Sequence, residues 1–185
     1  MKRPRPPYRV VESRLIYKGH IIRLVKDRFV LDRAPGKIVT RELIDHPGAV
    51  VVLPFVSRDR ILLLRQFRYA SQGDLWEIPA GTLEPGEDTL VCAKRELEEE
   101  TGHRASRWKL LTRFFCAPGI SNEVMTLYAA GRLRPGRKDL DHDEFIEHVE
   151  MPLKDALKLA RNGKVRDGKT LVGLLWASAY LPHGF

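Results

Sequence analysis

The first quarter of the chain consists of short segments in which β-branched and other apolar residues alternate with polar ones. Such alternation is typical of strands that bury one face. Gly19 and residues 33–36 interrupt the pattern and divide it into three segments. We therefore expect an N-terminal antiparallel β unit over residues 8–47. A flexible basic arm with three prolines, residues 1–7, precedes it.

From residue 48 the pattern changes to longer apolar runs and helical periods. AVVVLPFV at 49–56 predicts a strand buried on both faces, and ILLLRQFRY at 61–69 predicts the next strand. Further predicted elements are strands at 108–118, 123–133 and 145–151 and helices at 89–101, 152–163 and 168–181. This order predicts an α/β domain over 48–185, with a mixed sheet between helices.

Four glutamates stand close together in the predicted helix at 89–101, in a chain whose net charge is +8. On a helical wheel, Glu96 and Glu100 lie about 40° apart beside the apolar stripe, and Glu99 lies about 60° from Glu96. Glu98 lies roughly 160° from Glu96 and does not join them. Three of the four carboxylates therefore converge on one flank of the helix.

Two interpretations of these carboxylates are open at this point. The first is a solvated helix face. Against it, like charges at helical spacing cost a few tenths of a kcal/mol per pair, and carboxylates are unfavourable at a helix C-terminus. The second is a metal site, because a hard divalent cation such as Mg²⁺ removes the repulsion and prefers oxygen ligands.

The composition is that of a globular protein of 185 residues, 43% hydrophobic and 30% charged. No apolar stretch reaches the roughly 18 residues of a membrane span, and the basic start lacks the features of a secretory signal. The positive charge is spread along the chain, which suits a polyanionic small substrate, and no nucleic-acid-binding motif is recognisable. Cys92 and Cys116 stand in apolar surroundings, so we expect two reduced core cysteines of a cytoplasmic protein.

The spacing of residues around the glutamates decides between the two interpretations. Gly81 is followed after five residues by Glu87 and after seven more by the run RELEEETG at 95–102. This pattern resembles the signature of the Nudix hydrolases, with His103 in place of the final aliphatic residue. The resemblance implies the Nudix fold, an α/β/α sandwich with a mixed β-sheet. At His103 the sequence departs from the family pattern, and we expect this departure to affect local packing and not the metal chemistry.

The resemblance implies a chemistry for the motif. Glu96, Glu99 and Glu100 would bind Mg²⁺, for which Mn²⁺ can substitute, and the carbonyl of Ala80 would add a ligand. Arg95 would hold the neighbouring glutamates in position, and Glu87 would lie near the metals. The implied reaction is attack of water on a diphosphate linkage, which gives two monophosphates.

Residues outside the motif narrow the range of expected substrates. RQFRYASQGDLWEIPAG at 65–81, and Pro118 after the motif, resemble the ADP-ribose pyrophosphatase branch of the family. The resemblance implies that Arg68 contacts a substrate phosphate and that Arg41 helps to hold adenine. The open alternatives are ordinary strand arginines at both positions.

Two further side chains near this segment have open roles. Glu77 would orient the site or bind ribose, and the alternative is a salt-bridged strand residue. Trp76 either stacks on a base or packs in a core or dimer interface.

The catalytic base implied by the branch is a glutamate on a loop after the motif. We expect it at Glu144, in the stretch LDHDEF, where His142 interrupts the acidic run. The alternatives are a solvated acidic loop or another carboxylate: Asp141, Asp143, Glu123 or Glu99. Glu99, Glu144 and Arg95 are thus the candidate catalytic residues.

We therefore expect Mg²⁺-dependent hydrolysis of ADP-ribose to AMP and ribose 5-phosphate. The alternatives are another nucleoside diphosphate sugar or dinucleotide, such as GDP-mannose or NADH, and a non-catalytic ADP-ribose-binding regulator. An RNA-directed role rests only on the basic charge. The resembled branch exchanges its N-terminal β unit between protomers, which implies a homodimer.

Overall fold

A computed structural model describes residues 6–140, 145–181 and 185. The chain forms two compact units. The first combines the N-terminal residues up to Pro47 with Ala117–Glu123, and the second combines Gly48–Cys116 with Val124–Phe185. Within the described residues, no helix is long and apolar enough to cross a membrane.

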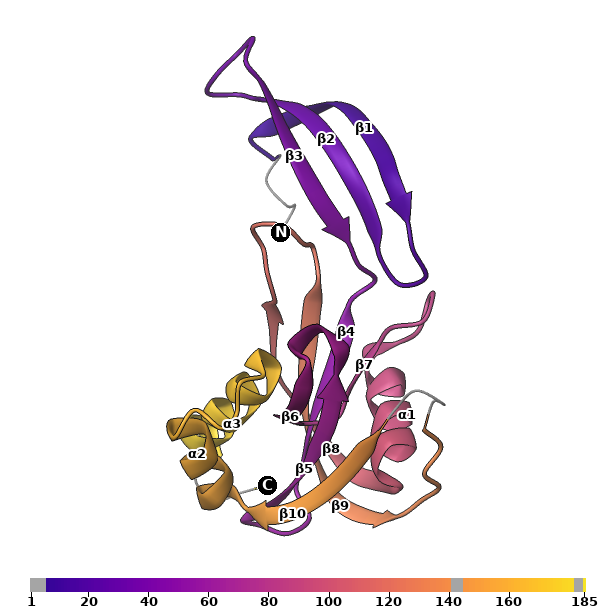
Figure 1. The fold of residues 1–185 in the computed structure, drawn as a ribbon, viewed down its shortest axis with the longest axis vertical. Helices are drawn as coiled ribbons and strands as arrows, with labels where there is room; N and C mark the ends of the chain where they lie inside the picture. The colour runs from indigo at the N-terminus through magenta and orange to yellow at the C-terminus, as the bar shows by residue number, and fades with distance from the viewer. Residues whose placement is uncertain (1–5, 141–144, 182–184) are drawn as a thin grey trace. The chain divides into compact units, whose positions relative to one another are not determined.

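The first unit is a three-stranded antiparallel sheet in the order β1-β2-β3 (Figure 1). Its strands are β1 (Tyr8–Lys18), β2 (Arg23–Leu31) and β3 (Ile38–Asp45). These strands confirm the antiparallel unit that the alternating pattern predicts. The segment 117–123 joins this unit, because Ser121 bridges to Ile44 and the Asn122 amide donates to Asp45 over 2.7 Å.

The second unit contains two sheets. The four-stranded sheet has the order β7-β4-β9-β8, in which β4 and β9 are parallel and the other pairs are antiparallel. The three-stranded sheet, β10-β5-β6, is antiparallel. The bounds are β4 (Ala49–Pro54), β5 (Arg60–Arg68), β6 (Gly73–Glu77), β7 (Ala80–Thr82), β8 (His103–Phe115), β9 (Val124–Pro135) and β10 (Ile146–Pro152), with a 3-10 turn at Tyr69–Ser71.

Helices cover both faces of this arrangement (Figure 1). They are α1 (Thr89–Thr101), α2 (Leu153–Arg161) and α3 (Gly168–Tyr180). Asp88 caps α1 by accepting from two backbone amides, and Asp167 caps α3 in the same way through Thr170 N. Gly102 ends α1 with φ = 69°, the left-handed conformation expected of a C-cap glycine.

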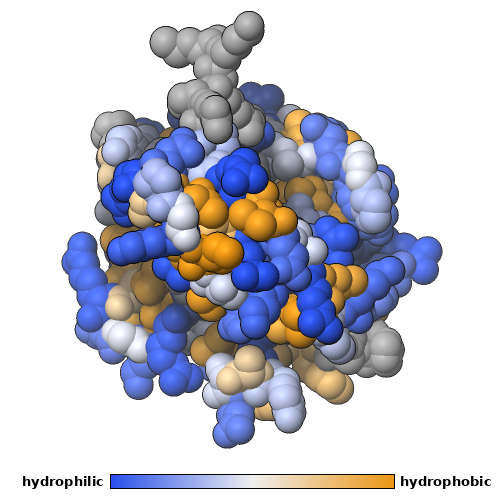
Figure 2. Space-filling model, turned by 90° about the horizontal axis from the view of Figure 1, so that it is seen from above, coloured by the Kyte–Doolittle hydropathy of each residue, from blue (hydrophilic) through white to orange (hydrophobic). Residues whose placement is uncertain are grey.

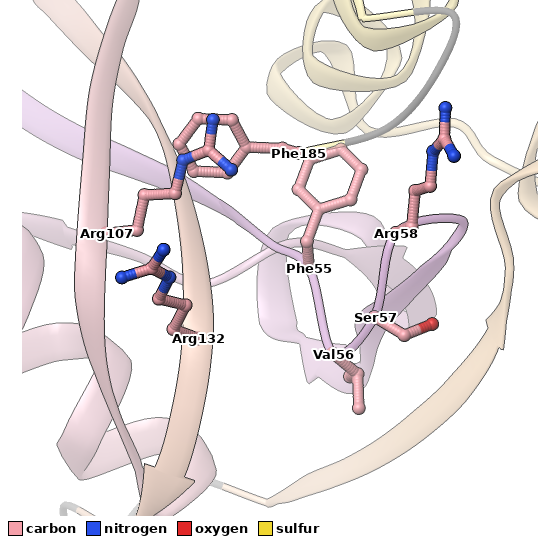
Figure 3. A pocket seen from close by; sticks show the side chains of 7 residues that line it. All are labelled: Phe55, Val56, Ser57, Arg58, Arg107, Arg132 and Phe185. Atoms are coloured by element: carbon pink, nitrogen blue, oxygen red, sulfur yellow. The ribbon is translucent and has the colours of Figure 1, made fainter.

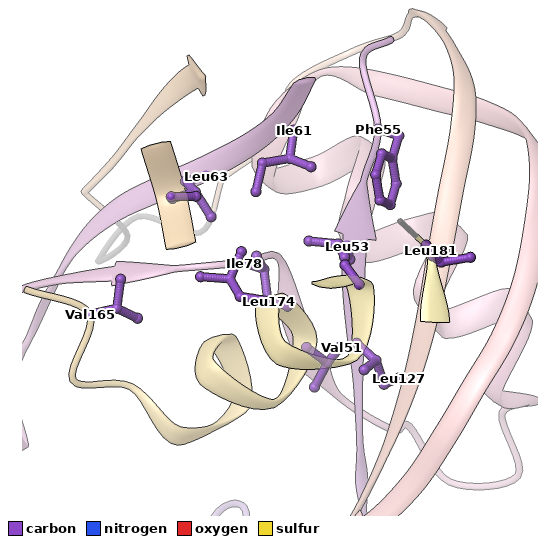
Figure 4. Packing of buried hydrophobic residues seen from close by; sticks show 13 residues of the cluster. Val51, Leu53, Phe55, Ile61, Leu63, Ile78, Leu127, Val165, Leu174 and Leu181 are labelled. Atoms are coloured by element: carbon purple, nitrogen blue, oxygen red, sulfur yellow. The ribbon is translucent and has the colours of Figure 1, made fainter. Parts of the chain in front are cut away.

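Strand β4 lies at the centre of the core because both of its faces are buried. Val51 and Leu53 pack with α2 and α3 (Figure 4), whereas Val50 and Val52 pack with α1. The fully apolar run at 49–54 therefore has a physical reason: neither face of this strand meets water. The observed architecture confirms the predicted α/β fold with a mixed sheet.

Three details differ from the sequence-based expectation. Cys92 is buried but Cys116 is exposed, so the prediction of two core cysteines is wrong for Cys116, which stands at the end of a strand. Strand β8 begins at His103, five residues before the predicted start, because its first residues pair with the end of β9, His103 with Pro135. Pro152 is the last residue of β10 and the N-cap of α2, and the helix itself begins at Leu153.

Candidate active site

The candidate site begins where strand β7 meets helix α1. Gly81 pairs with Val50 in the sheet, and the carboxylate of Glu96 lies directly against its α-carbon. A Cβ on Gly81 would lie 1.8 Å from both Cδ and Oε1 of Glu96. Any side chain at position 81 would therefore displace the Glu96 carboxylate from this position, whereas the φ of Gly81 is not in the left-handed region. The motif glycine thus creates the space that the motif glutamate fills.

Arg95 forms ion pairs with three carboxylates around this point. Its Nε lies 3.1 Å from Glu87, and its Nη1 lies 2.8 Å from Glu96 and 2.9 Å from Glu99. Nη2 also donates to the carbonyl of Thr82 over 3.5 Å. The hydrogen bonds with Glu87, the largest contribution, raise the pKa of Arg95 and lower the pKa of Glu87. The guanidinium therefore offsets the repulsion that the clustered glutamates create.

Glu100 is the buried carboxylate of the helix, with 2% of its surface exposed. Its Oε2 accepts a hydrogen bond of 3.1 Å from the backbone amide of Ala80. The hydrogen bonds to Glu77 raise the pKa of Arg68, and the charge of Glu100 adds to this rise. Glu100 thus connects the end of α1 to the residue just before the motif glycine.

Glu98 confirms the helical-wheel argument by pointing elsewhere. It binds Arg104 over 2.7 Å and accepts from the backbone amide of Arg137. The Arg104 hydrogen bond holds the pKa of Glu98 below its ordinary value. The wheel therefore places Glu98 apart from Glu96 correctly, because Glu98 pairs with Arg104 and Glu96 pairs with Arg95.

The chemistry of the donor set fits a divalent cation. Glu96, Glu99 and Glu100 offer only oxygen donors, and Gly81 gives the Glu96 carboxylate access to the β7 backbone. As the described side chains are arranged, however, no group of three or more His, Cys, Asp or Glu is placed to hold a metal ion. Arg95 pairs with Glu96 and Glu99 in this arrangement, whereas Glu100 bonds to Ala80.

A second cluster lies at the ends of β5 and β6. Arg68 donates from Nε and Nη2 to the two oxygens of Glu77, each over 2.9 Å. Burial raises the pKa of Glu77, but the hydrogen bonds and charges of Arg68 and Lys169 outweigh burial, and its pKa lies below the ordinary value. Glu77 therefore forms a salt bridge in the structure, as the alternative interpretation of this residue expects. A contact between Glu77 and ribose remains a prediction, and so does a contact between Arg68 and a substrate phosphate.

The start of helix α3 completes this cluster. Lys169 Nζ lies 2.5 Å from Glu77 and 3.0 Å from Asp167. Asp167 accepts from the backbone amide and hydroxyl of Thr170, and that hydroxyl accepts from the amide of Ile78. Lys169 and Asp167 are missing from the candidates that the sequence provides. The only sequence signal for them is the helix-capping pattern D-G-K-T at 167–170, which has no catalytic meaning by itself.

The other predicted residues belong to the first unit or lie outside the described residues. Arg41 is exposed in β3 of the first unit, and its guanidinium donates to the Thr40 carbonyl. Glu123 belongs to the same unit, with Oε1 at 3.9 Å from Nδ1 of His46. Glu144 and its alternatives Asp141 and Asp143 lie outside the described residues.

Two residues with open roles pack in the second unit. Trp76 packs against the hydrophobic core on the α2–α3 side, as expected if it is a core residue. His103 is half-buried, with its ring edge-on to His148 at 6.1 Å, so an aromatic contact replaces aliphatic packing there.

The chain is similar to known proteins over most of its length. The family model described as the NUDIX domain matches residues 45–171. An ADP-ribose pyrophosphatase from Bacillus subtilis is 38% identical over 164 residues, 88% of each chain. A methanol dehydrogenase activator from Bacillus methanolicus is 34% identical over 168 residues, 90% of each chain. A crystal structure of an ADP compounds hydrolase superposes with a TM-score of 0.82 at 20% identity, over 95% of this chain and 94% of that chain.

Proposed function

The chain belongs to the Nudix family and is a diphosphatase similar to ADP-ribose pyrophosphatases, and on that premise we propose that its substrate is ADP-ribose. The products are AMP and ribose 5-phosphate. The name of the Bacillus subtilis relative and the RQFR and EIPAG segments support this substrate. The observation that carries the diphosphatase chemistry is the placement of Gly81, Glu96 and Glu100 at β7.

Glu96, Glu99 and Glu100, with the carbonyl of Ala80, would hold Mg²⁺, and Mn²⁺ can substitute. When bound, the ion supplies Lewis-acid polarisation of the phosphates and lowers the pKa of the attacking water. Arg95 keeps Glu96 and Glu99 on one side of the helix through its Nη1 contacts. It is thus a positioning residue for two of the ligands.

Arg68 binds the diphosphate in this proposal. Its guanidinium is fixed by two hydrogen bonds to Glu77, yet 40% of the side chain is exposed. A planar, oriented and accessible guanidinium suits a phosphate oxygen. Lys169 also binds Oε2 of Glu77 and so helps to fix Arg68. Arg41 remains the proposed adenine contact.

Water attack on the diphosphate requires a proton acceptor. We assign this role to Glu144, with Asp141, Asp143, Glu123 and Glu99 as alternatives. Glu99 is already engaged by Arg95 in an ion pair of 2.9 Å, so its carboxylate serves the arrangement of the motif. This contact favours a loop residue over Glu99.

We also propose a homodimer formed through the first unit. All residues of β1 are exposed, and nine large apolar side chains of residues 8–38 are at least 36% exposed. They are Tyr8, Val10, Val11, Leu15, Ile16, Tyr17, Ile21, Ile22 and Ile38. Figure 2 shows hydrophobic side chains gathered among hydrophilic ones on the face it presents. Exposed apolar surface of this kind marks an interface. Sedimentation equilibrium tests the dimer, and a monomer at all concentrations would contradict it.

Product analysis on a substrate panel tests the proposed reaction. Purified protein with Mg²⁺ is incubated with ADP-ribose, GDP-mannose, NADH and a diadenosine polyphosphate, and products are separated by chromatography. We expect preferential release of AMP and ribose 5-phosphate from ADP-ribose. Preferential cleavage of another member would keep the diphosphatase but refute the substrate.

The name of the Bacillus methanolicus relative favours a second candidate, a regulator of another enzyme. Under this alternative, ADP-ribose would bind without turnover. The complete carboxylate set, Glu96, Glu99 and Glu100, supports catalysis instead. Calorimetric ADP-ribose binding in a protein that gives no product from any panel member would favour the regulator.

A further inference from the structure

A cavity of about 390 Å³ lies at the turn between β4 and β5 (Figure 3). Its wall carries three arginines, two phenylalanines and no acidic residue among the side chains that line it. These residues are Phe55, Val56, Ser57, Arg58, Arg107, Arg132 and Phe185. The nearby carboxylate of Asp59 accepts a hydrogen bond of 3.3 Å from the Ser57 hydroxyl. The cavity therefore presents concentrated positive charge.

This cavity is separate from the candidate active site. Gly81 pairs with Val50 near the start of β4, whereas Phe55 follows the end of that strand. Five residues of extended chain span about 16 Å. The cavity thus lies at the opposite end of β4 from the motif glutamates.

Arg132 reaches the cavity because its backbone is left-handed, with φ = 55° in strand β9. In a regular strand, residues of the same parity share a face. Here Ala130 and Leu133 both pack on the α1 side, so the alternation reverses between them. The reversal turns Arg132 away from α1. A left-handed non-glycine residue within a strand is unfavourable, and such residues concentrate at ligand sites.

Arg107 comes from the neighbouring strand β8, opposite Gly131. Its guanidinium carbon lies 4.3 Å from the centre of the Phe185 ring, a cation–π contact that orients the group. Gly131 leaves room for this ring, because a Cβ there would lie 3.1 Å from Phe185. Figure 3 shows the guanidinium groups of Arg107 and Arg132 on the same wall of the cavity.

Both guanidinium groups carry a positive charge and line the same cavity, so an anion between them would be favoured. No hydrogen bond or ion pair joins either group to a carboxylate in the part of the chain that the structure describes. Arg58, from the turn, lines the same cavity. Guanidinium groups bind oxyanions through paired hydrogen bonds, and a phosphate offers enough oxygens and charge for more than one arginine.

We propose that this cavity binds the phosphate group of a small phosphate monoester or of inorganic phosphate, with Arg107 and Arg132 as its main ligands. The site does not depend on the proposed function, since it shares no residue with the motif. The Ser57 hydroxyl lies within the same cavity lining and provides a further polar group.

Arg132→Gly is the sharpest variant for a test. Glycine adopts φ = 55° without strain, so the variant keeps the strand geometry and removes the whole arginine side chain, including its guanidinium. We expect it to melt at a higher temperature than the wild type without ligand. Arg134→Ala is the matched control, an exposed arginine two residues further along β9 that does not line the cavity.

Binding is measured by ¹H–¹⁵N NMR on metal-free protein, with inorganic phosphate, AMP and adenosine as separate ligands. We expect phosphate and AMP to shift the signals of Ser57 and the Nε–H groups of Arg107 and Arg132, with saturation, and adenosine to leave them unchanged. Loss of one charge-assisted contact in Arg132→Gly should weaken binding about tenfold. Arg134→Ala should bind like the wild type.

Three results would overturn the proposal. They are no shift of the cavity signals with either phosphate or AMP, equal shifts with adenosine, and wild-type affinity in both Arg132→Gly and Arg107→Ala. Shifts confined to Gly81 and the motif glutamates are one form of the first result, because they would place phosphate only at the active site. Shifts of the cavity signals by AMP but not by inorganic phosphate would support a monoester as the ligand.

Discussion

Arg68 and Glu77 form a two-pronged ion pair, in which Nε and Nη2 of the arginine each lie 2.9 Å from a carboxylate oxygen. The carboxylate is almost fully buried, whereas the guanidinium remains 40% exposed. Lys169 binds the same carboxylate from helix α3. The hydrogen bonds to Glu77 raise the pKa of Arg68, so it stays charged at any pH of interest. This arrangement fixes the direction of the guanidinium without covering it.

Replacement of Arg68 should therefore weaken substrate binding. For Arg68→Ala we expect the KM for ADP-ribose to rise roughly ten- to hundredfold through lost charge-assisted hydrogen bonds, with a smaller change in kcat. Steady-state kinetics provide the measurement. Arg65→Ala is the control, because Arg65 lies on the same strand and pairs with Asp74. A wild-type KM in Arg68→Ala would remove Arg68 from substrate binding.

Glu77 should contribute to the pH dependence of stability. Its pKa in the folded protein lies below the ordinary value of 4.5, despite burial, because Arg68 and Lys169 stabilise its charge. The unfolded chain therefore takes up the proton first as pH falls. The stabilisation is complete above about pH 4.5 and is lost as pH falls through the folded-state pKa.

Urea unfolding of the wild type and Glu77→Gln at several pH values below 6 measures this contribution. We expect the variant to be less stable at neutral pH and the difference between the two proteins to shrink as pH falls below 4.5. A difference that stays constant over the same range would show that Glu77 is not ionised in the native ion pair.

Gly81→Ala should disturb the site locally. The added methyl would lie 1.8 Å from the carboxylate of Glu96, so Glu96 must move. We expect kcat to fall by at least tenfold while circular dichroism remains native. Gly168→Ala is the control, because no atom lies within 4 Å of the Cβ it would add. Equal activity of Gly81→Ala and the wild type would show that the position of Glu96 does not matter for turnover.

The two thiols should react differently. Burial raises the pKa of Cys92 to about 12, so this group stays protonated and unreactive in the native protein, whereas Cys116 is exposed. Ellman's reagent should titrate one thiol per native chain and two after denaturation. In Cys116→Ser the native protein should give none. Rapid native labelling of Cys92 in that variant would contradict the burial of helix α1 against β4.

The sequence predicts the elements of the fold well where burial imposes a simple pattern. The run at 49–54 is apolar throughout because β4 is covered on both faces. Helix α1 can be predicted from the helical period of its apolar residues, from the N-cap Asp88 and from the C-cap Gly102. The start of β8 and the exposure of Cys116 cannot be predicted from the local sequence, since both depend on neighbours distant in the chain. The reversal at Arg132 has no signal in the local sequence either.

The candidate site is predictable in part for a similar reason. The three glutamates of one helix face follow from helical geometry, and Glu98 is excluded correctly by the same argument. By contrast, the ion pairs of Lys169 with Glu77 and Asp167 include a contact across 92 positions. No local pattern encodes such a contact. It appears only when α3 packs beside β6.

The most direct test of the central claim compares the wild type with Glu100→Gln. The glutamine keeps an oxygen that can accept from the Ala80 amide but loses the buried charge. AMP release from ADP-ribose is measured with Mg²⁺ and with a chelator, and melting temperature reports folding. We predict AMP release by the wild type only with Mg²⁺, and a loss of two or more orders of magnitude in Glu100→Gln with a native-like melting curve. Undiminished release in the chelator, or by Glu100→Gln, would contradict the assignment of Glu96, Glu99 and Glu100 as metal ligands of a diphosphatase.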